Sequence, residues 1–185
     1  GTSESGPVIS EDGERQAFER AAAMIIADHP FGIGSNQYVV VANTKGYSDR
    51  AGVIWNYGSR AAHVHNVYKV VHAETGFLGL ATFLLLFATV IISSIRLAWR
   101  FRRHPLGVLV LGCGTALATV ALHGLYEWIF VTADCQYLFG TMVGMIAGAS
   151  VQLRRDAAMR RARLHERTRT AEAELPVADG APVAA

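Results

Sequence analysis

One histidine stands where the polar and apolar parts of this sequence meet. His65 and Asn66 are followed, after nine residues, by Gly76-Phe-Leu-Gly79 at the start of a long apolar run, with Glu74 just before it. Imidazole gains and loses a proton near neutral pH. If the run enters a membrane, His65 lies at the surface, where a lipid-linked substrate could meet an acceptor on the water side. The arrangement therefore indicates chemistry at the bilayer interface.

Three segments have the composition of membrane-spanning helices. Each has about 20 residues without Asp, Glu, Lys or Arg, enough to cross roughly 30 Å of hydrocarbon. We place these spans at about 76–95, 106–126 and 136–153. The sequence predicts an all-α integral membrane protein.

The arginines predict which way the spans run. They cluster between positions 96 and 103, after the first span, and between 154 and 169, after the third. Because basic loops stay in the cytoplasm, both clusters belong on that side and the residues before Gly76 lie outside. We expect a periplasmic helical loop region at 1–75, three transmembrane helices within 76–153, and a basic, partly disordered cytoplasmic tail at 154–185.

The loop region should contain at least one amphipathic helix. Ser10 could cap a helix running to about Asp28, with an apolar stripe, and His29-Pro30 would end it. Residues 37–42 could be helical or extended, and 45–62 have no clear period, which predicts an irregular loop.

A second helix should begin near His63 and continue into the first span. On it His65, Lys69, His72 and Gly76 would share one polar face. In the third span Gly140, Gly144 and Gly148 would allow another helix to approach closely.

We expect the chain to be the C-terminal part of a larger multi-span protein. It begins with Gly and has no signal peptide, so an upstream segment would be needed to export the loop region. Cys113 and Cys135 fall toward opposite ends of their spans, too far apart to form a disulfide.

Several motifs together resemble a known family. They are Arg15-Gln-Ala-Phe18, Asp28-His-Pro-Phe-Gly-Ile-Gly34, and His65-Asn66 with nine residues before Gly76-Phe-Leu-Gly79. The combination resembles the C-terminal part of the O-antigen ligase and O-antigen polymerase superfamily, over roughly 14–152. In this chain the His-Pro turn is one residue tighter than in the family.

The resemblance implies a metal-independent, polytopic glycosyltransferase of the bacterial inner membrane, part of a larger GT-C-like fold, with its active site facing the periplasm. The donor would be a glycan on undecaprenyl diphosphate, and the acceptor the lipid A core or another glycan. The alternatives within the superfamily are an O-antigen or exopolysaccharide polymerase and a protein O-oligosaccharyltransferase. The family's essential histidine and arginine fall on His65 and Arg15.

The chemistry of these side chains suits such a transfer. Histidine can accept the proton of an acceptor hydroxyl, and the planar guanidinium of arginine matches phosphate oxygens without a metal. We take His65 and Arg15 as the catalytic candidates. Lys69 could either contact phosphate or act on the protonation of His65. The substrate-binding candidates are Asn66, Lys69, His72, Glu74 and Arg20.

Other interpretations remain open. His65 could cap a helix, Arg15 and Arg20 could lie on a solvated helix face, and Glu74 could pair with Lys69. His123 and Glu127, near the outer end of the second span, could contact their neighbours or line the cavity rather than react. Phe31-Gly-Ile-Gly34 is more typical of a structural turn than of a phosphate-binding loop.

We expect no metal, no cofactor and no nucleic acid. A site made of His63, His65, His72 and Glu74 is disfavoured because residues two apart point in different directions on a helix. The expected partners are the lipid-linked donor, the glycan acceptor and membrane lipids. A non-catalytic membrane assembly subunit is the alternative from a different class.

Overall fold

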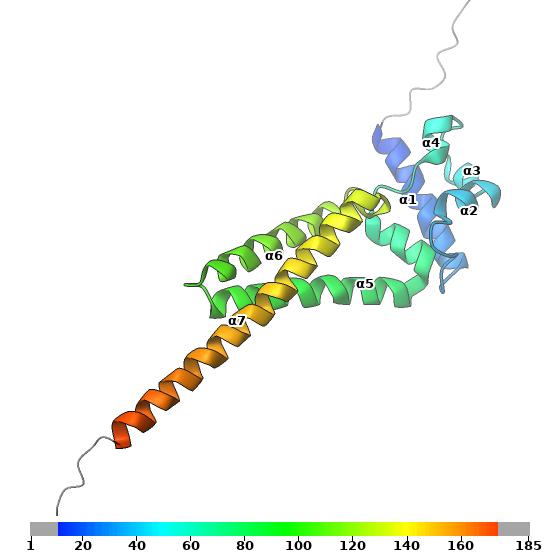
Figure 1. Ribbon diagram of the computed structural model, residues 1–185. Helices are drawn as coiled ribbons and strands as arrows, with labels where there is room; N and C mark the ends of the chain where they lie inside the picture. The colour runs from blue at the N-terminus through cyan, green and yellow to red at the C-terminus, as the bar shows by residue number, and fades with distance from the viewer. Residues whose placement is uncertain (1–10, 174–185) are drawn as a thin grey trace, which may run out of the picture.

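The computed structural model describes residues 11–173, and this part of the chain contains helices but no strand. Figure 1 shows a group of short helices at one end and long helices leading away from it. The elements are α1 (Glu11–Asp28), α2 (Tyr38–Thr44), α3 (Tyr47–Ala51), α4 (Tyr57–Ala61), α5 (Val67–Arg100), α6 (Pro105–His123), the 3-10 turn η1 (Ile129–Val131) and α7 (Ala133–Ala173). The predicted all-α class is confirmed.

A loop domain, residues 11–75, packs around α1. The predicted end of α1 at Asp28 is confirmed, while the expected cap, Ser10, lies outside the described residues. Ala17, Ala21 and Ile25 of the predicted stripe are almost fully buried. They form one core with side chains from α2, α3 and the first turns of α5. Burial of this stripe holds the short helices in place, since helices of five to seven residues are not stable alone.

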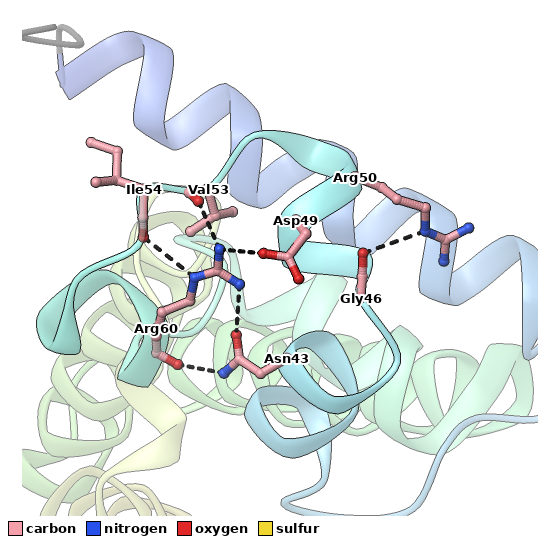
Figure 2. Close-up of polar contacts among 7 residues, drawn as sticks. All are labelled: Asn43, Gly46, Asp49, Arg50, Val53, Ile54 and Arg60. Carbon is pink, nitrogen blue, oxygen red and sulfur yellow. Dashed lines mark hydrogen bonds and ion pairs between the residues drawn. The ribbon is translucent and has the colours of Figure 1, made fainter.

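The expectation of an irregular loop over 45–62 is wrong. This stretch contains α3 and α4, and 38–44 form α2. Arg60 joins these pieces: its guanidinium contacts the Asp49 carboxylate at 2.6 Å, the Val53 carbonyl at 3.1 Å and Asn43 Oδ1 at 3.4 Å (Figure 2). The Arg60 side chain is only 12% exposed. Such tertiary hydrogen bonds have no local periodicity, so the sequence pattern did not reveal the helices.

The predicted continuous helix from His63 is also wrong. α5 begins at Val67 and is broken at Gly76, which has φ 70° and ψ −173°, a conformation open essentially only to glycine. The break receives the Phe31-Gly-Ile-Gly34 turn: Ile33 and Gly34 donate backbone hydrogen bonds to the carbonyls of Ala73 and Glu74, at 3.0 and 2.9 Å. The turn is therefore structural.

Glycine at Gly32 and Gly76 allows the two backbones to touch. A Cβ at Gly32 would lie 2.4 Å from the Glu74 carbonyl oxygen, and one at Gly76 would lie 2.5 Å from the Phe31 carbonyl carbon. Neither backbone can move away without breaking the hydrogen bonds between them. This contact fixes the loop domain to the start of the apolar part of α5.

Two helices in the described part are long and apolar enough to cross a membrane, α5 and α6. Only 11% and 22% of their most apolar windows are buried, which is unlike the core helix of a soluble protein. These helices are consistent with a membrane protein. Residues 136–153, the expected third span, lie in α7, which contains Gln136 and several glycines and is less apolar; that span remains a prediction.

α7 continues from this segment into the basic tail. It has 41 residues, and the predicted tail is helical as far as Ala173; the rest of the tail lies outside the described residues. Near the start of α7, ring contacts join α5, η1 and α7, with 5.0–5.8 Å between ring centroids. They involve Phe83, Phe87, Phe130 and Phe139. No atom within the described part approaches the Cβ positions of Gly140, Gly144 and Gly148, so the helix expected to pack there is not seen.

Candidate functional site

His65 lies in an extended segment between α4 and α5, facing the end of α6. Its Nδ1 atom is 3.2 Å from Oε2 of Glu127. The ring is flanked by Phe18 and Trp128, with centroid distances of 6.0 and 6.5 Å. Because a carboxylate only accepts hydrogen bonds, this pair places the proton of the neutral imidazole on Nδ1 and leaves Nε2 as the acceptor. The His65 side chain remains 35% exposed, so a substrate can reach it.

Asn66 fixes this segment. Its Oδ1 accepts the backbone N–H of Lys69 at 3.1 Å, which caps α5, and its Nδ2 donates to the Leu125 carbonyl at 3.0 Å. The Val67 N–H also donates to the Gly124 carbonyl, at 2.8 Å. These bonds hold the start of α5 against the end of α6 and set the His65–Glu127 distance. Asn66, predicted to bind substrate, has both ends of its amide engaged with the backbone.

Arg15 lies beside this pair on α1. Its guanidinium carbon is 5.4 Å from the ring centroid of Tyr126, the neighbour of Glu127. Phe18, about one turn further along α1, contacts His65. Arg15 makes no hydrogen bond or ion pair with any described residue. Its guanidinium donors are therefore available for an anion, and the two predicted catalytic residues lie on one surface.

Two further cations predicted to bind substrate have partners within the protein. Lys69 Nζ lies 3.3 Å from Oε2 of Glu19, which ties α5 to α1. Arg20 donates from Nη2 to the Ala51 carbonyl at 2.9 Å, at the end of α3. The geometry favours the structural interpretation of Arg20, whereas Lys69 is half-exposed and stays close to the site.

Glu74 and His72 do not join His65. The Glu74 carboxylate accepts the backbone N–H groups of Asn36 and Tyr38, at 2.9 and 3.1 Å, at the start of α2. His72 is half-buried on α5 and has no polar or ring contact within residues 11–173. The expected shared face fails because His65 precedes the helix and Gly76 breaks it. The described residues contain no cluster of three His, Cys, Asp or Glu able to hold a metal, and both cysteines are free.

His63 is packed under the site. It stacks on Tyr38 at 5.8 Å and contacts the Trp128 ring at a tilt of 32° and 5.4 Å, measured between ring centroids. Burial lowers the pKa of His63 below its usual value, and the charge of Glu74 opposes this shift. The Trp128 indole N–H is buried and has no hydrogen-bond partner among the residues described. This aromatic layer supports the segment that carries His65.

The pairing of Glu127 with His65 was not predicted from the sequence. From the sequence, Glu127 was expected to contact its neighbours or line the cavity rather than to react. Tyr126-Glu127-Trp128 was a visible signal, because it places an acidic residue between aromatic residues at a predicted membrane surface. The pairing itself spans 62 positions and depends on the antiparallel packing of α5 and α6, which brings the residues before α5 against those after α6, so no local pattern shows it. Comparisons with protein-family models, with curated proteins and with solved structures find no match for this chain.

Proposed function

We propose that this chain is part of an O-antigen ligase-like glycosyltransferase of the bacterial inner membrane, acting at its periplasmic face. It would transfer a glycan from undecaprenyl diphosphate to an acceptor sugar such as the lipid A core. The observation that carries the proposal is the His65–Glu127 pair at 3.2 Å, with Nε2 open to substrate and the uncommitted guanidinium of Arg15 on the same surface. The resemblance of the motifs supplies the substrate class.

In the proposed reaction, His65, Arg15 and Glu127 each have a separate role. His65 Nε2 takes the proton of the acceptor hydroxyl as its oxygen forms a bond to the anomeric carbon. The bond from that carbon to the diphosphate oxygen breaks, and the leaving diphosphate keeps the electron pair. Arg15 stabilises the new negative charge. Glu127 holds the ring and stabilises the imidazolium, as a carboxylate does in a catalytic triad.

Complementation tests the proposal. The full-length protein, as wild type or His65→Ala, is expressed in a strain that lacks its own O-antigen ligase, and glycan on lipid A core is scored. We expect rescue by wild type and by His165→Ala, an exposed control on α7, but not by His65→Ala at equal membrane levels. Equal rescue by His65→Ala would remove His65 from the mechanism. Absence of rescue by wild type would refute a ligase for this acceptor.

A further inference from the structure

A groove lies between α5 and α7 at the end of the molecule remote from His65. Its volume is about 760 Å³. α5 contributes residues from Thr89 to Arg100, and α7 contributes residues from Val143 to Arg161. Figure 1 shows that both helices run away from the loop domain. The groove therefore follows the direction of the proposed spans, with its later residues furthest from the loop domain.

The lining of the groove changes character along its length. Its first part is apolar, with Val90 on α5 and Val143 and Ile146 on α7, and Ser93 and Ser150 follow. The last part is basic, with Arg96 and Arg100 on α5 and Arg154 and Arg161 on α7. An apolar lining suited to an acyl chain thus gives way, within one cavity, to four cationic groups at the end of the proposed α5 span.

The four arginines of the groove have no carboxylate partner within the described residues. The ion pairs seen there use Arg60, His65, Lys69 and His104 as the basic members. Arg100 only lies over the ring of Phe101, at 5.9 Å. Four unneutralised guanidinium groups facing one cavity favour an anion, and arginine matches phosphate oxygens in particular.

We propose that this groove binds one molecule of an anionic phospholipid, with the headgroup phosphate among the arginines and an acyl chain against the apolar part. A free phosphate ion has the same chemistry as the lipid headgroup, but it would contact only the basic half of the groove. The apolar half, which a free ion would leave unused, favours the lipid. In the orientation proposed above, the site lies in the cytoplasmic leaflet, where anionic lipids attract basic juxtamembrane segments.

Charge variants test the headgroup half. Purified full-length protein in detergent is titrated with phosphatidylglycerol or phosphatidylcholine, and bound lipid is counted by native mass spectrometry. One double variant carries Arg154→Gln and Arg161→Gln, both in the groove. The control double variant carries Arg155→Gln and Arg163→Gln, which removes equal charge from α7 outside the groove. We expect phosphatidylglycerol binding to fall about tenfold or more in the first pair, and less than about twofold in the second.

A bulky substitution tests the acyl-chain half without changing charge. Ala147 lines the groove, whereas Met145 is exposed on α7 outside it. We expect Ala147→Trp to weaken phosphatidylglycerol binding and Met145→Trp to leave it unchanged. The proposal is overturned by equal binding of the two lipids, by equal losses in both arginine pairs, or by no effect of Ala147→Trp. Displacement of the lipid by excess inorganic phosphate would also overturn it, in favour of a free-anion site.

Discussion

The predicted site residues differ in which of their polar atoms have partners within the protein. His65 and Arg15 keep donor or acceptor atoms without partners in the described part of the chain. By contrast, hydrogen bonds to backbone groups are made by the side chains of Asn66, Arg20 and Glu74. The atoms already bonded to the backbone are not available to a substrate. This distinction separates two groups that the sequence alone presented as one polar cluster.

Glu127 should position His65 and stabilise its charged form. Glu127→Gln keeps the shape of the side chain but loses the charge-assisted hydrogen bond, so we expect kcat to fall about 10- to 100-fold. KM should change little, because in the proposed mechanism Glu127 acts through His65 and not on the substrate. Transferase assays on the full-length protein measure both constants. Asp134→Asn, an exposed change near the same end of the helices, serves as the control, and an unchanged kcat in Glu127→Gln would contradict the role.

Burial of His63 predicts a loss of stability in acid. Its pKa is lowered in the folded protein, so the unfolded chain, with a histidine pKa of about 6.5, binds the proton more readily. Stability is therefore present above that value and is lost as the pH falls through the lowered pKa. Thermal unfolding of the full-length protein in detergent at neutral and mildly acidic pH measures the loss. His63→Phe should reduce it, and the exposed His123→Gln should not.

At the scale of elements, the break in α5 decides where the loop domain sits. The Phe31–Gly34 turn fills the break and bonds to both sides of it, and the Phe77 N–H donates to the Pro30 carbonyl at 3.2 Å. α1 and α5 are further joined by the Lys69–Glu19 ion pair. These contacts position α1, which carries Arg15, relative to the segment that carries His65, so the candidate site also depends on the Phe31–Gly34 turn, which contains no predicted catalytic residue.

Gly76→Ala should loosen this connection. Alanine disfavours the backbone conformation at Gly76, at a cost of about 1–3 kcal/mol, and its Cβ would overlap the backbone of Phe31. We expect a lower unfolding temperature and faster proteolysis of the loop domain. Gly58→Ala, on exposed helix α4 with only an ordinary contact at 3.4 Å, should be neutral or stabilising by up to about 1 kcal/mol. Equal behaviour of the two variants would show that the break is not required.

At the scale of the whole molecule, the polar chemistry lies at two opposite ends. The His65 surface belongs to the loop domain, and the basic groove lies where α5 and α7 are furthest from it. The apolar faces of α5 and α6 between them are largely unburied. A bilayer would cover these faces and separate the two ends, one on each side.

The path of α7 can be tested by labelling. In a full-length protein with Cys113 and Cys135 replaced by Ser, Ala61→Cys marks the loop domain and Ala162→Cys the tail. If α7 spans the membrane, an impermeant maleimide should label position 61 in spheroplasts and position 162 only after permeabilisation. Labelling of both from outside would show that only α5 and α6 cross. Labelling of position 162 alone would reverse the orientation.

The sequence by itself determined the helical class, the end of α1 at Asp28, the apolar character of α5 and α6, and the choice of His65 and Arg15 as candidates. These follow from local periodicity, composition and side-chain chemistry. Only the tertiary structure decided that Glu127 faces His65, that Glu74 caps the start of α2, that Arg60 joins α3 and α4, and that Gly76 breaks α5. Each of these depends on backbone and side-chain groups distant in sequence meeting in space, which no local pattern records.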